Sequence, residues 1–271
     1  MPVKNRALDC GGCEKISKVI DMKVRHLISG IAIAGLFTAH AYAGISLDRT
    51  RMVITENDRS VSATLSNTSP DIPFLAQSWL EDSEGKKITS PLVVLPPLQR
   101  INGGQKGIAK INKTAGSLNL PQDRESLFYL NVREIPPKPK KENTLQLAMQ
   151  SRIKVFYRPK AVIPKNKSVI WQDQLVFTKK GTSGFKLENP TPYYVTVLGL
   201  SKKLQKEGGG SLTSFPGMMI APKSSTEITV SDNKLNEFSI MYVNDYGGHP
   251  ELKFSCQNAV CRALPQDQQP R

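Results

Sequence analysis

The chain has 271 residues, which is room for one or two domains, and its 19 prolines and 19 glycines suit an all-β protein with many turns. The formal net charge is +14 at pH 7. No apolar stretch after residue 43 is long enough for a transmembrane helix, so we expect no stable insertion into a membrane.

The N-terminus has the pattern of an export signal. Lys23 and Arg25 precede a short apolar run that ends at Ala41-Tyr42-Ala43, a small-residue pattern of the kind that signal peptidase cleaves. We expect residues 1–43 to be an N-terminal extension and signal peptide, with the signal at 22–43. Without residues 1–43 the chain keeps a net charge of +11, but an exported protein meets little nucleic acid, so we expect no nucleic-acid partner.

Two features precede the signal. Cys10 and Cys13 have the Cys-x-x-Cys redox spacing, but no βαβ pattern surrounds them, and we expect them to have no role in the mature protein. Met22 is a candidate for the true start of translation. In that case residues 1–21 would not be translated.

From Gly44 onward the pattern is one short strand after another, without a convincing amphipathic helix. Seven short strands in little over a hundred residues is the number expected of an immunoglobulin-like sandwich. We place this first domain at residues 44–159. Its candidate strands are residues 45–54, 61–67, 74–80, 92–95, 107–111, 127–134 and 145–157.

A second set of strands follows a polar, proline-containing linker. We place a second immunoglobulin-like domain at residues 160–265 and a polar tail at 266–271. The candidate strands are residues 169–177, 185–188, 193–201, 218–220, 226–230, 238–243 and 252–256.

Cys256 and Cys261 fall at the end of this second domain. The four residues between them fit a disulfide across a tight turn between strands in an oxidising compartment. A zinc site would need further ligands, and His249 is the only histidine after residue 43. We therefore expect a disulfide and no metal.

The most informative stretch runs from Leu127 to Pro159, where two apolar-alternating arms are joined by a short, charged turn. We interpret it as a long β-hairpin. In the second arm, Leu145, Leu147 and Met149 share one parity, and Lys154 has the other. This arm is about twice the usual strand length, so part of it extends beyond its own sheet. Such an overhang leaves an unpaired edge that can recruit another chain.

The sequence LPQDRESLFYLNVREIP at 120–136 resembles the signature of the periplasmic chaperones of chaperone/usher pilus assembly, most closely the PapD-type chaperones. The similarity implies a non-enzymatic all-β protein whose two immunoglobulin-like domains join at an angle with a cleft between them. It also implies pilin subunits as clients, an outer-membrane usher that receives them, a periplasmic location and no cofactor. The matching motifs include SLDRTR at 46–51, SRIKVFYRP at 151–159, WQDQL at 171–175, ENPTPYYVT at 188–196 and VNDYGG at 243–248.

By this resemblance, Arg51 and Lys154 match two basic residues that hold the C-terminal carboxylate of a pilin subunit in the cleft. A guanidinium and an ammonium supply the charge-assisted donors that a carboxylate needs when it leaves water. Sequence alone does not distinguish Arg51 from Arg49, or Lys154 from Arg152.

Leu145, Leu147 and Met149 match the apolar row of the strand that the chaperone lends to a pilin, whose immunoglobulin-like fold lacks its last strand. The alternative is that these three residues are ordinary inward-facing core. A bulge or strand twist is needed to bring Lys154, on the opposite parity, into the same site. The same edge also offers the free protein a surface for self-association.

Glu125, Arg158 and Asp245 match a charged trio that links the two domains and fixes their angle. The alternative is that they are three unrelated surface charges. The resemblance also implies a disulfide near the C-terminus, in agreement with Cys256 and Cys261.

We therefore expect a periplasmic chaperone that binds and caps pilin subunits by donor-strand complementation and delivers them to an outer-membrane usher. The short turn at 137–143 is typical of members that serve rod-like adhesive pili. One rival is a secreted two-domain immunoglobulin-like adhesive or structural protein, which predicts no stable complex with a pilin. Another is a secreted hydrolase that uses His249, but no Gly-x-Ser-x-Gly elbow or phosphate-binding loop accompanies that histidine.

Overall fold

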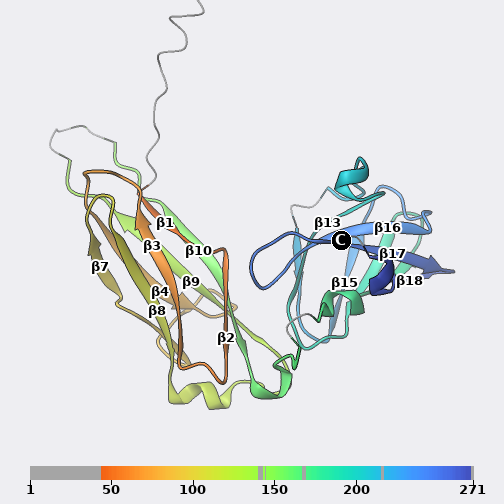
Figure 1. Cartoon of the computed structure of the whole chain (residues 1–271), viewed down its shortest axis with the longest axis horizontal. Helices are drawn as coiled ribbons and strands as arrows, with labels where there is room; N and C mark the ends of the chain where they lie inside the picture. Colours follow the sequence, from red (N-terminus) through yellow and green to blue (C-terminus); the bar gives the residue numbers. More distant parts are fainter. Residues whose placement is uncertain (1–43, 140–142, 144, 167–168, 215–216, 270–271) are drawn as a thin grey trace, which may run out of the picture. The chain divides into compact units, whose positions relative to one another are not determined.

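The computed structural model describes residues 44–269 except 140–142, 144, 167–168 and 215–216 (Figure 1). The expected signal peptide, Cys10 and Cys13 lie outside these residues. Regular structure in the described part consists of β-strands and short 3-10 helices, so this part is all-β, as predicted. None of its helices is long and apolar enough to cross a membrane.

The N-terminal domain consists of two β-sheets (Figure 1). In the second sheet, β2 and β10 are parallel, and the other pairings of both sheets are antiparallel. The first sheet has the order β1 (Ile45–Leu47), β3 (Ser60–Asn67), β8 (Lys106–Lys113) and β6 (Leu92–Leu95). The second has the order β2 (Arg51–Thr55), β10 (Gln150–Arg158), β9 (Ser126–Ile135), β4 (Phe74–Glu81) and β5 (Lys87–Ile88), with β7 (Leu98–Ile101) also on β4.

Alternation along β10 decides which side chains reach the core. Ile153, Val155 and Tyr157 are buried in the core of the N-terminal domain. Lys154 therefore lies on the other face of the sheet, because successive side chains of a strand point to opposite faces. The register between β10 and β9 is unbroken from Gln150 to Tyr157, so no bulge shifts Lys154 to the parity of Met149.

The expected strand at 145–157 is wrong over its first five residues. Regular pairing in β10 begins at Gln150, and residues 145–149 belong to no strand. The neighbouring strand β9 ends at Ile135, and Pro136 and Pro137 follow it. In the register of β10 with β9, Leu147 and Gln146 would face Pro136 and Pro137. Proline has no N–H to donate to a ladder, so regular pairing does not continue along these residues.

The expected strand at 45–54 is also divided. Residues 45–47 form β1 in one sheet, and residues 51–55 form β2 in the other. Asp48 lies in the segment where the chain passes from one sheet to the other. Its carboxylate accepts a hydrogen bond from the backbone N–H of Thr64 on β3 (3.0 Å). β2 therefore begins afresh at Arg51, beside β10.

The strands of the C-terminal domain form one hydrogen-bonded sheet around their own core. The ring centroid of Phe177 lies 5.1 Å from those of both Phe238 and Phe254. A disulfide joins Cys256 to Cys261, as predicted, and links β17 to β18. The order is β14 (Met218–Ile220), β13 (Val195–Ser201), β16 (Glu237–Val243), β17 (Glu251–Gln257), β18 (Val260–Ala263), β11 (Val176–Lys180), β12 (Gly184–Asn189) and β15 (Ser224–Thr229).

Short 3-10 helices connect the strands. The expected strand at 169–177 is wrong in its first part, because Trp171–Gln174 form a 3-10 turn and β11 starts only at Val176. The 3-10 helices are η1 (Ala115–Asn119), η2 (Lys160–Val162), η3 (Trp171–Gln174), η4 (Gln205–Glu207) and η5 (Gln266–Gln268).

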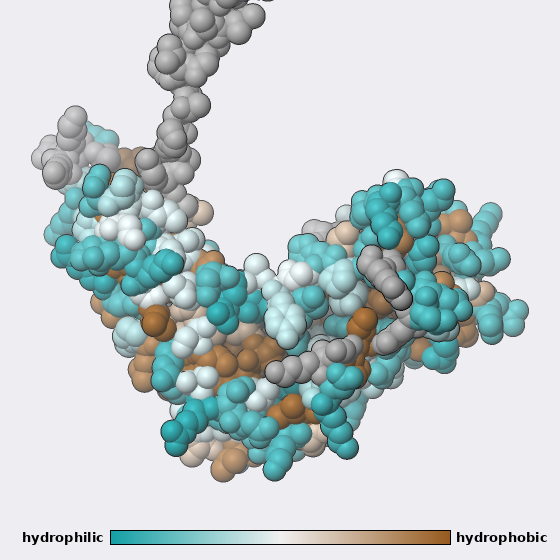
Figure 2. All heavy atoms as spheres, in the orientation of Figure 1, coloured by the Kyte–Doolittle hydropathy of each residue, from teal (hydrophilic) through white to brown (hydrophobic). Residues whose placement is uncertain are grey.

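On the face drawn in Figure 2, hydrophilic residues predominate and hydrophobic residues form separate patches.

Candidate functional site

Arg51 and Lys154 lie beside each other. They are direct partners in the parallel pairing of β2 with β10, so both side chains project from the same face of the sheet. Both are partly buried, and neither forms an ion pair with an acidic side chain in the described residues. The Nη1 atom of Arg51 donates a long hydrogen bond to the carbonyl oxygen of Val243 (3.4 Å), and its Nε is buried without a partner.

Burial and mutual repulsion disfavour the charged forms of Arg51 and Lys154, and a bound anion would offset both effects. Burial lowers the pKa of Arg51, while the negative charges of Asp245 and Glu125 act in the opposite direction. The pKa of Lys154 is lowered first by burial and then by the positive charge of Arg51. An incoming carboxylate would relieve both effects, because an opposite charge at close range favours the charged form of each group.

The two basic residues that sequence could not separate from this pair have partners of their own. Arg49 forms an ion pair with Asp48 (3.0 Å) in an exposed position. Arg152 forms an ion pair with Glu81 (3.1 Å), and its guanidinium carbon lies 3.4 Å from the centroid of the Tyr129 ring. Their charges are therefore already compensated, unlike those of Arg51 and Lys154.

Leu145, Leu147 and Met149 are not core residues. Their exposed fractions are 84%, 74% and 61%, which excludes the alternative that they face inward. The backbone begins to join the sheet at Met149, whose carbonyl oxygen accepts a hydrogen bond from the N–H of Glu134 (3.0 Å). The carboxylate of Glu134 accepts a hydrogen bond from the N–H of Met149 (3.1 Å) and another from the N–H of Ile45 (2.8 Å).

The edge of β10 is only partly covered. β2 pairs with β10 from Lys154 to Arg158, whereas residues 150–153 pair with β9 alone. One side of the backbone at 150–153 therefore has no strand partner in the described part of the chain. An uncovered edge offers N–H and C=O groups to an additional strand, and here it continues directly from the exposed apolar row.

Glu125, Arg158 and Asp245 come together as a trio. The guanidinium of Arg158 donates two hydrogen bonds to Glu125 (2.7 and 2.9 Å) and two to Asp245 (3.0 and 3.2 Å). Glu125 also accepts from the backbone N–H of Tyr194 (2.8 Å). Burial acts to lower the pKa of Arg158, but the two carboxylates outweigh it and raise the pKa above its ordinary value. Glu125 and Arg158 are buried, so they are not unrelated surface charges.

Phe156 lies beside the cation pair, and the sequence motifs did not single it out as a site residue. It lies between Lys154 and Arg158 on the same face of β10, since the three positions are two residues apart. The guanidinium carbon of Arg51 is 5.8 Å from the Phe156 ring centroid, and the Tyr194 ring is 5.7 Å away. Period-two alternation does place Phe156 on the face of Lys154, but it does not indicate a role in the site.

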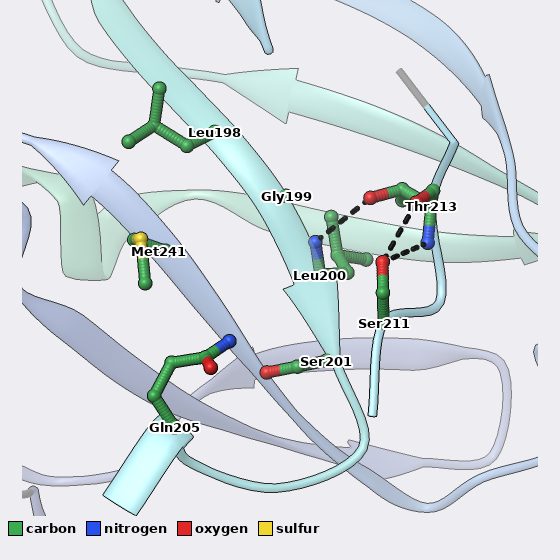
Figure 3. A pocket seen from close by; sticks show the side chains of 8 residues that line it. All are labelled: Leu198, Gly199, Leu200, Ser201, Gln205, Ser211, Thr213 and Met241. Carbon is green, nitrogen blue, oxygen red and sulfur yellow. Dashed lines mark hydrogen bonds between the residues drawn. The ribbon is translucent and has the colours of Figure 1, made fainter. Parts of the chain in front are cut away.

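The C-terminal domain contains a separate small pocket. A pocket of about 180 Å³ in the C-terminal domain, lined by residues such as Leu200, Ser211 and Thr213, has no ionisable side chain in its lining (Figure 3). The Oγ1 atom of Thr213 accepts a hydrogen bond from the backbone N–H of Leu200 (3.3 Å). His249 is exposed between β16 and β17. No group of three His, Cys, Asp or Glu side chains in the described residues is arranged to hold a metal ion.

Comparison with known proteins agrees with this architecture. The family model of the pili and flagellar-assembly chaperone PapD N-terminal domain matches residues 44–163. The model of the pili assembly chaperone PapD C-terminal domain matches residues 170–254. Together they define a two-domain, all-β pilus-assembly chaperone. The chain belongs to the PapD family of pili assembly chaperones.

The matches with similar proteins cover nearly the whole length of those proteins. The chaperone protein PmfD of Proteus mirabilis is 59% identical over 92% of this chain and 97% of its own. The crystal structure of the periplasmic chaperone SfaE has a TM-score of 0.61 at 32% identity, covering 78% of this chain and 98% of its own. The Salmonella enterica SafB chaperone, solved in complex with the SafA pilin, has a TM-score of 0.67 at 23% identity, covering 80% and 99%, which shows the shared fold.

Proposed function

We propose that the chain is a periplasmic chaperone that binds pilin subunits by lending them the exposed row Leu145, Leu147 and Met149. One observation carries the proposal: this row leads into the uncovered edge of β10, and that edge ends beside Arg51 and Lys154. Membership of the pili assembly chaperone family supports pilins as the clients.

The cation pair favours one direction for the bound strand. β2 runs parallel to β10 and begins at Arg51. A subunit strand that continues the line of β2 along residues 145–153, in the same direction, ends with its C-terminal carboxylate beside Arg51 and Lys154. A strand in the opposite direction would place an α-ammonium there, next to two cations. Like charges repel, so the subunit strand runs parallel to β10.

Donor-strand binding divides affinity and specificity between backbone and side chains. The backbone edge supplies hydrogen bonds that every subunit strand can form. The apolar row, spaced by two residues, presents its side chains on one face and fills the groove of an incomplete immunoglobulin-like fold. Such binding needs no nucleotide, metal or other cofactor. Membership of a family of assembly chaperones supports a protein that acts by binding and not by catalysis.

The cellular setting follows from the same proposal. The N-terminal signal directs the chain to the periplasm, where the chaperone caps the subunit and delivers it to an outer-membrane usher. In the absence of a subunit, the same apolar row supports self-association. In this proposal, the two immunoglobulin-like domains of the chaperone are residues 44–159 and residues 160–265.

The test is co-expression with a pilin subunit encoded by a neighbouring gene, with three versions of the chain. We expect wild type and Arg152→Ala to co-purify with the subunit, because Arg152 has Glu81 as its own partner. We expect Lys154→Ala to lose the complex. Failure of wild type to form a complex with any neighbouring pilin would refute the chaperone role. Equal yields from wild type and Lys154→Ala would refute the carboxylate anchor alone.

A further inference from the structure

The turn between β16 and β17 lies against the beginning of β2. The carbonyl oxygen of Val243, at the end of β16, accepts the hydrogen bond from Arg51 Nη1 (3.4 Å). At Gly247 there is no room for a side chain: a β-carbon added there would lie 2.5 Å from Oγ1 of Thr50. The turn therefore contacts Arg51, the first residue of β2, and lies close to Thr50, which precedes it.

The turn has a defined conformation of its own. The side-chain oxygen of Asn244 accepts hydrogen bonds from the N–H groups of Tyr246 (3.0 Å) and Gly248 (2.8 Å). The N–H of Gly247 donates to the carbonyl oxygen of Asn244 (3.0 Å). An Asn side chain that bonds the backbone two residues on is a common way of fixing a turn.

A second contact fixes the turn from the opposite side. Asp245 accepts two hydrogen bonds from Arg158 on β10 (3.0 and 3.2 Å). The turn is thus held by hydrogen bonds from Arg51 on β2 and from Arg158 on β10. These strands carry the two cations, Arg51 and Lys154.

Arg51 has few other contacts that define its orientation. Its Nε has no hydrogen-bond partner, and its guanidinium lies over the Phe156 ring at 5.8 Å. The Val243 carbonyl is a directional acceptor, and it leaves other N–H groups of the guanidinium free for a second partner.

We propose that the β16–β17 turn is a positioning element for the carboxylate anchor: Val243 orients Arg51, and the lack of a β-carbon at Gly247 lets the turn lie close enough to Thr50 for this hydrogen bond to form. This inference rests on the proposed function of Arg51 and Lys154. It makes the C-terminal domain a contributor to recognition of the subunit's C-terminus.

Gly247→Ala tests the proposal, with Gly85→Ala as the matched control. Gly247 and Gly85 have nearly equal positive φ angles, +85° and +87°, so alanine brings similar backbone strain to both turns. A β-carbon at Gly85 meets nothing within 4 Å, whereas one at Gly247 displaces the turn from Thr50. A double variant with Thr50→Ala removes the obstructing Oγ1 and leaves the Thr50 β-carbon 3.9 Å away, an ordinary contact.

The readout is the affinity for a synthetic peptide that copies the C-terminal strand of a pilin, prepared as the free acid and as the C-terminal amide. Calorimetry with the full chain measures both. For Gly247→Ala we expect the affinity for the free-acid peptide to fall roughly tenfold, as for the loss of one hydrogen bond to a charged group. The affinity for the amide peptide should change little. Gly85→Ala and Thr50→Ala should match wild type, and Gly247→Ala with Thr50→Ala should recover.

Each contrary outcome has a distinct meaning. If Gly247→Ala lowers the affinity for the acid and the amide peptide equally, the turn only stabilises the domain contact, which overturns the positioning role. No loss in Gly247→Ala, or no recovery in the double variant, would overturn it too. If wild type binds neither peptide, the proposed function itself fails. Thermal unfolding of each variant confirms that the variants compared are folded.

Discussion

Lys154 on β10 and Arg51 on β2 are direct partners across parallel strands, and no acidic side chain in the described residues forms an ion pair with either. Two partly buried cations at this separation raise the free energy of the folded chain unless an anion joins them. The arrangement therefore has a cost in the free protein that binding of a carboxylate removes.

Replacing Lys154 by methionine should separate stability from binding. The variant keeps an apolar stem of similar length and removes the repulsion from Arg51. We expect the free energy of unfolding in urea to be unchanged or slightly higher than in wild type. Affinity for the pilin peptide should fall on the order of a hundredfold, as for loss of one partner of a desolvated charge pair. A variant that is destabilised and still binds would contradict the account.

The affinity for the free-acid peptide should depend on pH through Lys154. Its pKa in the free protein is lowered by burial and by Arg51, and a bound carboxylate raises it again. Binding therefore favours the protonated form, so affinity is highest at lower pH and falls as pH rises through the pKa of Lys154 in the free protein. Calorimetry across the alkaline range measures this. Lys154→Arg should remove the dependence, because arginine stays protonated.

A parallel fall in wild type and Lys154→Arg would mean that another group titrates. The amide peptide is a further control. It carries no terminal charge, so its weaker affinity should change little over the same pH range.

Leu147→Asp should affect binding without affecting folding. The side chain is 74% exposed and lies outside the strands. We expect the free energy of unfolding to change by less than about 0.5 kcal/mol, the usual range for surface substitutions. Co-purification with a pilin should be lost, because a charge would enter an apolar groove, and self-association seen by sedimentation should weaken. A destabilised variant would show instead that Leu147 packs inside the protein.

Arg158→Ala should be among the most destabilising single changes in the chain. It leaves the buried carboxylate of Glu125 with no cationic partner, and breaking a buried pair costs about 3–5 kcal/mol. Urea unfolding measures the loss. Arg124→Ala is the control, since Arg124 forms an exposed ion pair with Asp123, and exposed pairs contribute little to stability. Similar effects of the two changes would remove the trio from the account.

Most strand positions could be predicted from the sequence because burial with period two is visible in residue type. Ile153, Val155 and Tyr157 alternate with more polar residues, and they are the core positions of β10. The strand limits could not be predicted in the same way. Residues 145–149 alternate equally well, but strand pairing also requires a neighbour that donates N–H groups, and Pro136 and Pro137, opposite Leu147 and Gln146, have none.

The candidate site was only partly predictable. The motifs placed Arg51 and Lys154 beside two other basic residues, and only the partners of Arg49 and Arg152 distinguish them. The Val243 carbonyl leaves no signal in the sequence, because every residue has a backbone acceptor. The contact of Gly247 with Thr50 depends on how the two domains meet, which local sequence patterns do not encode.

Hydrogen exchange of the full chain, alone and in complex with a pilin subunit, tests most directly whether the uncovered edge of β10 is the segment lent to the subunit. We expect the fragments that span residues 145–153 to become strongly protected in the complex, since their backbone gains a partner strand. Residues 154–158 should change little, because β2 already pairs with them. A stable complex in which residues 145–153 exchange as fast as in the free protein would contradict the account.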